Sequence, residues 1–322
     1  MEFRNLKHTD LKVSRLCFGT MTFGRPVQQD DAKTMIETCL AAGINFVDTA
    51  NMYQLGAAEE ILGKALKGIR DTVVLTSKVR MKMGERPDEV GLSRRAIERA
   101  IEDSLRRLQT DYLDIYFLHQ PDYDVPIDET LEAMETLVKA GKVRYPGTSN
   151  YASWQLVQML ELARARNYTP CLISQPMYNL LARGIEQEFL PMAKACDVST
   201  MVYNPLAAGL LTGKHRKDVV PEGGRFDKNR MYQDRYWNDR TFEAVDRLKQ
   251  IATDAGRSLV SFAFAWLLHH TASDVVILGA SSLEQLRQNL QAGAEGPLPE
   301  DAVAACDQVW QDFRGPVPNY NR

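Results

Sequence analysis

Short apolar runs alternate with longer amphipathic segments along this 322-residue chain, and that alternation predicts an α/β fold. Eight such runs favour a closed (β/α)₈ barrel, the TIM-barrel architecture, over an open doubly wound sheet. The Gly-x-Gly-x-x-Gly turn that an open dinucleotide-binding sheet would carry after an early strand is missing from the sequence. We therefore expect residues 1–322 to form a single barrel domain.

The first expected element is an N-terminal β-hairpin. Phe3–Leu6 and Leu11–Ser14 have strand-like composition, and the turn candidate His8-Thr9-Asp10 separates them. Because the hairpin precedes the first barrel strand, we expect it to plug the floor of the barrel.

The barrel strands are expected where β-branched and apolar residues cluster in short runs. These runs are Leu16–Gly19, Phe46–Asp48, Val73–Ser77, Tyr112–Leu118, Val143–Gly147, Leu172–Gln175, Thr200–Tyr203 and Val275–Leu278.

Helices are expected between the strands. In Ser93–Leu108, for example, apolar residues recur at helical spacing and polar residues fill the other faces. Asp30 is the expected N-cap of the first helix after the first strand, and Gly43 and Gly141 lie where helices should end.

Two segments depart from the regular alternation. Asn204–Asn238, after the seventh strand, is long and rich in Gly, Arg and Tyr, which is typical of a functional loop. Glu295–Arg322 is expected to add a short helical piece and then an irregular stretch at Gly315-Pro316-Val317-Pro318 that crosses a face of the barrel.

Composition narrows the class of protein. A net charge of −3 with 44% hydrophobic residues argues against a disordered chain and against a nucleic-acid partner. The five scattered cysteines contain no Cys-x-x-Cys pair, which predicts reduced thiols and a cytoplasmic location. We expect no membrane contact, because the N-terminus lacks an apolar leader and the apolar stretch Val260–Leu268 is too short to span a bilayer.

Reactive side chains follow three successive strands of the expected barrel. Asp48 ends the second strand and Tyr53 comes shortly after it, Lys78 ends the third strand, and His119 ends the fourth. Each alone has a structural interpretation, such as a cap, a surface charge or a packed ring. Their coincidence at the rim where barrel enzymes carry their active sites favours catalysis.

This set of residues suits proton donation to a carbonyl oxygen while a hydride reaches the carbonyl carbon. Tyr53 is the proton donor, and the ammonium of Lys78 is expected to lower its pKa from about 10. Asp48 would hold Lys78 by an ion pair, and His119 would orient the carbonyl group. We expect no metal site, because His269 and His270 are neighbours on a helix and their rings diverge.

The strings Asp48-Thr49-Ala50-Asn51-Met52-Tyr53, Thr76-Ser77-Lys78 and Phe117-Leu118-His119 resemble the catalytic tetrad of the aldo-keto reductase superfamily. The resemblance begins at Leu11–Leu16 with Gly19-Thr20-Met21 and covers essentially the whole chain. It implies a barrel that binds NADPH (NADP) without a Rossmann motif, with Gly19, Thr20, Met21 and Asp48 beside the cofactor.

The resemblance also implies the remaining cofactor contacts. Ser149, Asn150 and Gln175 offer the donors and acceptors that a nicotinamide carboxamide needs, and Tyr203 matches the stacking aromatic ring. The diphosphate would lie along the segment that contains Asn204, Pro205, Leu206, Gly209, Leu211, Gly213 and Lys214.

A 2′-phosphate would lie at the start of the last barrel helix. The residues implied there are Gly279, Ser281, Ser282, Gln285, Arg287, Gln288 and Asn289, with Arg225 from the long loop. Gly279 and Gln285 depart from the family's usual Lys and Arg, so serines and arginines must hold the phosphate.

Ser281–Leu286, Ser149–Trp154 and Pro318-Asn319-Tyr320 resemble the aflatoxin-aldehyde and succinic-semialdehyde reductase branch. Arg235 and Arg322 match positions that grip acidic substrates there, with Tyr232 alongside. The alternative is that Arg235 is a surface cation and Arg322 a frayed terminus. The resemblance implies NADPH-dependent reduction of aldehydes, including carboxylate-bearing ones, reactive ketones and dicarbonyls, as in detoxification.

Two other functions stay open. Some barrels of this superfamily are non-catalytic NADPH-binding regulatory subunits of ion channels, although the complete tetrad argues against that role. A glycosidase would need two rim carboxylates, and Asp114, the partner available to Asp48, lies in mid-strand. The small-molecule carbonyl substrate is the expected partner, and the protein is expected to be a monomer or a homodimer.

Overall fold

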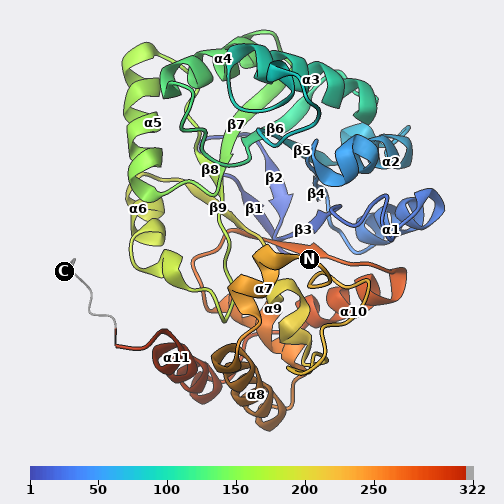
Figure 1. The fold of residues 1–322 in the computed structure, drawn as a ribbon, viewed down its shortest axis with the longest axis vertical. Coiled ribbons are helices and arrows are strands. Elements are labelled where there is room, and N and C mark those ends of the chain that lie inside the picture. Colours follow the sequence, from blue (N-terminus) through green and yellow to red (C-terminus); the bar gives the residue numbers. More distant parts are fainter. Residues whose placement is uncertain (317–322) are drawn as a thin grey trace.

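The computed structural model describes residues 1–316 and confirms the barrel prediction (Figure 1). In this part of the chain, parallel strands close into a barrel in the order β10-β3-β4-β5-β6-β7-β8-β9. Their bounds differ from the expected runs by two residues at most, and they are β3 (Leu16–Gly19), β4 (Phe46–Asp48), β5 (Val74–Val79), β6 (Leu113–Leu118), β7 (Val143–Ser149), β8 (Ile173–Gln175), β9 (Ser199–Val202) and β10 (Val275–Gly279).

Helices surround the strands as an outer ring (Figure 1). The α-helices are α1 (Gln29–Ala41), α2 (Ala57–Ala65), α3 (Arg94–Leu108), α4 (Ile127–Lys139), α5 (Ser153–Arg166), α6 (Phe189–Ala195), α7 (Arg230–Tyr236), α8 (Asp239–Asp254), α9 (Leu259–His269), α10 (Leu283–Ala294) and α11 (Glu300–Arg314). Short 3₁₀ turns lie at η1 (Tyr53–Gly56), η2 (Arg70–Thr72), η3 (Pro87–Glu89), η4 (Gly184–Glu186) and η5 (Ala207–Thr212).

The residues predicted to start or end helices occupy those positions in the structure, with one exception. In α3 the Ser93 side chain accepts a hydrogen bond from the backbone N–H of Ala96, and the predicted apolar face is buried. Gly43 and Gly141 follow α1 and α4 with φ angles of 82° and 71°, which glycine adopts most easily. The Asp30 prediction was wrong, because α1 starts at Gln29 with Gln28 as its N-cap. Asp30 lies in the first turn, where its charge still complements the helix dipole.

The hairpin plug is confirmed. Strands β1 (Phe3–Asn5) and β2 (Lys12–Ser14) pair antiparallel, and Leu6, Leu11 and Val13 join the hydrophobic cluster inside the barrel. The strand residues in that cluster are Cys17, Phe46, Val74, Ile115, Phe117, Ile173, Met201, Val275 and Ile277. The hairpin therefore closes the end of the barrel opposite the carboxyl ends of the strands.

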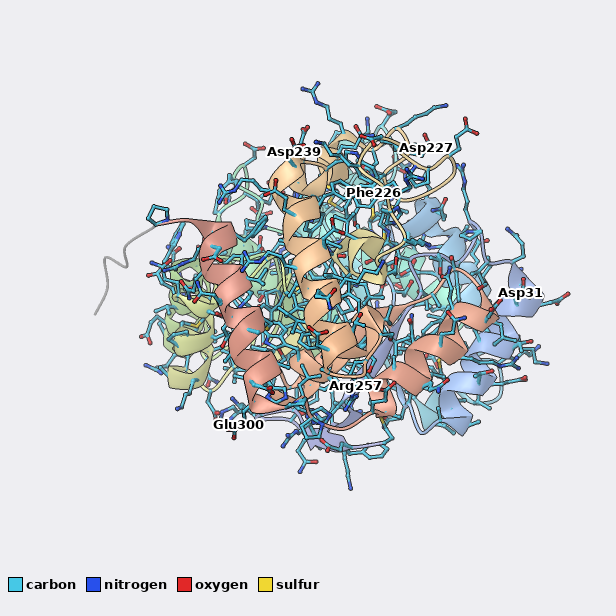
Figure 2. The ribbon with its side chains drawn as sticks, turned by 90° about the horizontal axis from the view of Figure 1, so that it is seen from below. Asp31, Phe226, Asp227, Asp239, Arg257 and Glu300 are labelled. Atoms are coloured by element: carbon cyan, nitrogen blue, oxygen red, sulfur yellow. The ribbon has the colours of Figure 1, made fainter. Side chains whose placement is uncertain are left out.

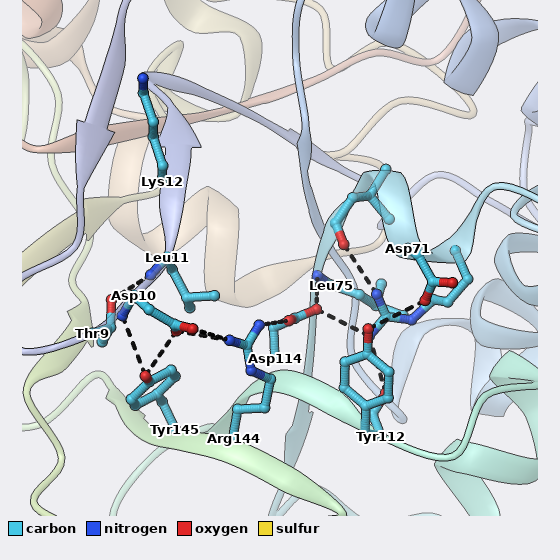
Figure 3. A network of polar contacts seen from close by, with 12 residues as sticks. Thr9, Asp10, Leu11, Lys12, Asp71, Leu75, Tyr112, Asp114, Arg144 and Tyr145 are labelled. Atoms are coloured by element: carbon cyan, nitrogen blue, oxygen red, sulfur yellow. Dashed lines mark hydrogen bonds and ion pairs between the residues drawn. The ribbon is translucent and has the colours of Figure 1, made fainter.

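An ionic network joins the hairpin to the barrel floor (Figure 3). The buried Asp114 carboxylate accepts hydrogen bonds from Arg70 at 2.9 Å, from Arg144 at 2.7 Å and from the backbone N–H of Leu75 at 2.9 Å. Arg144 also reaches Asp10 in the hairpin turn at 2.7 Å. Asp114 thus stabilises the floor and faces away from the catalytic rim, which removes it as a second rim carboxylate.

The two irregular segments contain more helix than the sequence suggested. The loop after β9 holds η5 and α7, and the C-terminal segment forms α11, which packs along α8 rather than being a short piece. In Figure 2, Phe226 and Asp227 lie at one end of the molecule, and Arg257 and Glu300 lie at the other. Among the described residues, none of the helices has both the length and the apolarity to cross a membrane.

Candidate active site

The carboxyl ends of β4, β5 and β6 bring the four predicted catalytic residues to one rim. Asp48 is the last residue of β4, Tyr53 opens η1, Lys78 is the penultimate residue of β5, and His119 follows β6 directly. The β4–β5 and β5–β6 pairs are in parallel register, so these strand ends lie at the same edge of the barrel.

Lys78 is completely buried and is held by Asp48. The Lys78 ammonium donates to both Asp48 carboxylate oxygens, at 2.7 and 2.6 Å, and to the backbone carbonyl of Thr49 at 2.7 Å. Burial lowers the pKa of Lys78, but attraction by Asp48 and other partners outweighs that effect, so the pKa lies above its ordinary value. The buried ammonium therefore stays charged at neutral pH.

The Asp48 carboxylate has two further donors. Thr76 donates its hydroxyl at 2.7 Å, and the Gln175 carboxamide donates at 3.0 Å. Four hydrogen bonds thus fix one buried carboxylate, which in turn fixes the position of the Lys78 ammonium.

Tyr53 lies against both Lys78 and His119. The Lys78 nitrogen is 5.2 Å from the centroid of the Tyr53 ring, and the Tyr53 and His119 rings meet edge to face at 6.1 Å. Burial raises the pKa of Tyr53 above 10, and Lys78 acts against that rise. The expected net lowering of the Tyr53 pKa was therefore wrong, because the loss of solvation exceeds the effect of the nearby ammonium.

His119 is neutral at physiological pH. Burial, with a smaller contribution from the Lys78 charge, lowers the pKa of His119 to about 3. Its Nδ1 atom is buried without a hydrogen-bond partner in the described structure. A neutral imidazole with one uncommitted nitrogen can bind a polar group of a substrate beside Tyr53.

The residues predicted to bind a nicotinamide carboxamide adjoin the tetrad. Ser149 donates to the backbone carbonyl of Gln175 at 2.9 Å, and Gln175 is the residue that donates to Asp48. Asn150 donates to the His119 carbonyl at 3.0 Å and accepts from the Tyr203 hydroxyl at 2.8 Å. The predicted stacking ring and the predicted amide-binding side chains therefore form one surface with the catalytic residues.

The predicted diphosphate segment follows β9 as a strained turn. Ala207, Ala208 and Gly209 have consecutive positive φ angles of 47°, 59° and 102°, and Asn204 accepts from the backbone N–H of Ala208 at 2.6 Å. Non-glycine residues in this region cost roughly 1–3 kcal/mol each and are concentrated at ligand sites. Around this turn lie Pro205, Leu206, Leu211, Gly213 and the exposed Lys214.

The first strand contributes to the same rim. The Thr20 backbone N–H and hydroxyl donate to the Asp48 carbonyl, at 2.9 and 3.1 Å, and Met21 is exposed. A Cβ atom at Gly19 would lie 2.8 Å from Ile277, so this position in β3 requires glycine.

The predicted 2′-phosphate segment begins α10. Ser282 is the N-cap and accepts from the backbone N–H of Gln285, whose side chain in turn accepts from Ser281. The first N–H groups of a helix lack intrahelical partners and attract anions, and the exposed Arg287 follows within two turns. This donor set fits a phosphate. Gln288 bonds Glu284, Asn289 bonds the Gly279 carbonyl, and Gly279 is exposed.

Of the two arginines predicted to bind substrate, Arg235 and Arg322, the structure describes only Arg235. Arg235 on α7 is exposed, lies 5.8 Å from the Tyr232 ring centroid and affects the pKa of Tyr203 by its charge. Tyr232 likewise affects the pKa of Tyr53, so α7 faces the catalytic residues. Arg225 lies 5.8 Å from the same Tyr232 ring. Arg322 falls outside the described residues.

The structure adds polar residues that sequence reasoning did not assign. Thr76 bonds Asp48, and the buried Tyr236 hydroxyl accepts from the side chains of Asn179 and Asn204. Thr76 stands in a quoted motif, but nothing in the sequence links Asn179 to Tyr236. In residues 1–316, His, Cys, Asp and Glu side chains form no cluster that could hold a metal ion.

Known proteins are similar in sequence to most of this chain. The Aldo/keto reductase family matches residues 15–311. "Aflatoxin B1 aldehyde reductase member 2" of Rattus norvegicus is 38% identical, covering 94% of this chain and 86% of the relative. "Probable voltage-gated potassium channel subunit beta" of Oryza sativa is 35% identical, covering 91% of each. Given the extent of these matches, the chain belongs to the aldo/keto reductase family and is an oxidoreductase of that family.

Proposed function

We propose that this protein reduces aldehydes to alcohols with NADPH, with Tyr53 as the proton donor. The observation that carries the proposal is the buried Lys78 ammonium, fixed by Asp48 and directed at the Tyr53 ring beside a neutral His119. A partly buried acid and a fixed cation at the carboxyl ends of barrel strands are suited to carbonyl reduction.

Each side chain has a separate task in this proposal. When bound, NADPH would supply the hydride that the carbonyl carbon accepts. Tyr53 is protonated at neutral pH because its pKa lies above 10, so it can donate its proton to the carbonyl oxygen. Lys78 stabilises the phenolate that remains, and His119 donates a hydrogen bond that orients the carbonyl group.

The cofactor preference rests on two segments of the chain. The turn at η5 and the start of α10 supply backbone N–H groups, serine hydroxyls and arginines, which suit a dinucleotide that carries a 2′-phosphate. Gly279 and Gln285 provide no charge there, so the predicted preference for NADPH over NADH depends on Ser281, Ser282 and Arg287.

For the substrate we propose aldehydes that carry a carboxylate, with reactive ketones and dicarbonyls as further candidates. Arg235 is an exposed guanidinium on the helix that faces Tyr53, and an arginine there can pair with a substrate carboxylate. The names of the aflatoxin aldehyde reductases of Rattus norvegicus and Homo sapiens support an aldehyde as the substrate class.

The test is the oxidation of NADPH, followed by its absorbance, with a panel of carbonyl compounds. The panel contains 4-nitrobenzaldehyde, 2-carboxybenzaldehyde, succinic semialdehyde and methylglyoxal, with NADH measured in parallel. We expect turnover with NADPH and the highest kcat/KM for the two acidic aldehydes. Absence of turnover with every compound would reject the reductase function.

A second candidate is an NADPH-binding regulatory subunit without catalytic activity. The similarity to proteins named as potassium channel beta subunits favours it, at 35% identity in Oryza sativa and in Arabidopsis thaliana. Such a subunit would bind NADPH tightly, with quenching of protein fluorescence, and show negligible turnover with the same panel.

A further inference from the structure

A second ionic network lies directly outside the barrel wall behind the tetrad. Glu59 on α2 is completely buried, and its carboxylate accepts a hydrogen bond from the Ser77 hydroxyl at 2.5 Å and one from the Arg107 guanidinium at 2.7 Å. Ser77 precedes Lys78 in β5, and successive strand residues point to opposite faces. Lys78 therefore points into the barrel while Ser77 points outward to α2.

The network lies next to the strained turn that carries Tyr53. Gln54 and Leu55 have φ angles of 49° and 53°, and Gly56 has a φ of 97°. Two consecutive non-glycine residues in the left-handed region are unfavourable, and such a conformation persists only where its surroundings hold it. Helix α2 begins immediately after this turn, so whatever fixes α2 also fixes the turn.

The Arg107 side chain packs against this turn. A Cβ atom at Gly56 would lie 2.8 Å from the Arg107 side chain, so the arginine stem packs directly against the glycine. The same side chain then pairs with Glu59. The turn, the start of α2 and β5 are thus connected through one buried carboxylate.

We propose that Glu59 is a positioning residue. By binding Ser77, which lies in the same strand as Lys78, it holds the turn that carries Tyr53 at a fixed distance from Lys78. Only the predicted effect on kcat rests on the proposed reductase function. The structural content of the proposal is that the link from Ser77 to Glu59 determines where the Tyr53 ring lies. A shift of about 1 Å at a catalytic group lowers rates by up to about a hundredfold.

The discriminating variant is Ser77→Ala, which removes the link and leaves the Glu59–Arg107 ion pair intact, so the fold is retained. We expect kcat to fall at least tenfold while the Kd for NADPH stays within twofold of wild type. Ser77→Thr keeps a hydroxyl on a strand residue and should restore kcat to within threefold.

Ser261→Ala is the matched control. Ser261 is also completely buried and donates to a carboxylate, Glu295 at 2.6 Å, which pairs with Arg257 at 2.7 Å. That cluster lies in and just before α9 and directly after α10, and it includes none of the elements that carry the tetrad. In Figure 2, Arg257 lies at the end of the molecule away from Phe226. We expect Ser261→Ala to leave kcat unchanged.

A readout independent of turnover separates this proposal from the proposed function. In protein labelled with ¹³Cζ-tyrosine, the Tyr53 resonance is assigned by its loss in Tyr53→Phe. We expect Ser77→Ala to shift or broaden that resonance and Ser261→Ala to leave it unchanged. An unchanged Tyr53 resonance in Ser77→Ala, or equal losses of kcat in Ser77→Ala and Ser261→Ala, would overturn the proposal. If the wild-type protein does not turn over, the reductase function fails while the resonance still decides the positioning role.

Discussion

Replacing Asp48 by Asn tests the buried ion pair. The substitution keeps the shape of the side chain but removes the charge that holds the Lys78 ammonium at 2.6 Å. Lys78 is completely buried, so the variant must either keep an unpaired ammonium in the barrel or release its proton.

The free energy needed to deprotonate Lys78 sets the upper limit of the loss of stability in Asp48→Asn. An unfolded lysine has a pKa of about 10.4, so a neutral Lys78 costs about 4.6 kcal/mol at pH 7 and about 2 kcal/mol at pH 9. Removing one partner of a buried ion pair usually costs about 3–5 kcal/mol, in agreement with this limit. With an unfolding entropy of roughly 2 cal/mol/K per residue, a loss of about 4 kcal/mol lowers the Tm of a 322-residue chain by about 6 °C.

The sign of the pH dependence follows from proton binding. In wild-type protein the pKa of Lys78 lies above its unfolded value, so its stabilising contribution is complete below about pH 10 and is lost only above that. With Lys78 neutral in Asp48→Asn, the folded protein binds fewer protons than the unfolded chain, so the stability of the variant relative to wild type rises with pH.

Thermal unfolding of both proteins at pH 7 and pH 9, followed by circular dichroism, measures these quantities. We expect a Tm deficit of about 6 °C at pH 7 that shrinks by about half at pH 9. A variant with the Tm of wild type at pH 7, or with a deficit that grows at pH 9, would refute the account of the ion pair.

Three further predictions concern other parts of the molecule. Asp114→Asn should lose about 3 kcal/mol of unfolding free energy in urea titrations while kcat stays within twofold, because its arginine partners lie at the barrel floor; a large fall in kcat would contradict this. Because the pKa of His119 is about 3 in the folded protein, its contribution to stability is lost as pH falls from about 6.5 towards 3, and kcat should show no titration near pH 6.5. A pH–rate profile with an inflection there would show that His119 titrates in the folded protein. Arg235→Ala should raise KM about tenfold for 2-carboxybenzaldehyde but not for 4-nitrobenzaldehyde, and equal changes for both would exclude a carboxylate contact.

The barrel and the tetrad were predictable from sequence because both depend on local patterns. The pattern of apolar runs places each strand end to within two residues, and a closed parallel barrel brings those ends to one rim, so Asp48, Lys78 and His119 came together as expected.

Properties that depend on packing were not predictable in the same way. The pKa of Tyr53 follows from how deeply its ring is buried, which no local pattern reports. Gln28 occupies the N-cap position of α1 without a side-chain capping hydrogen bond, although Asp30 has the better capping side chain, because backbone geometry sets where the helix starts. Glu59 reads as a surface charge on an amphipathic helix, and only the tertiary contact with Arg107 reveals a buried ion pair.

The most direct test of the central claim is the turnover of NADPH with 2-carboxybenzaldehyde by wild-type protein and by Tyr53→Phe. A positioned general acid contributes about 10²–10⁴-fold to rate, so we expect kcat to fall at least a hundredfold while the Kd for NADPH, measured by fluorescence, is unchanged. Turnover by Tyr53→Phe close to the wild-type rate would contradict the claim that Tyr53 donates the proton.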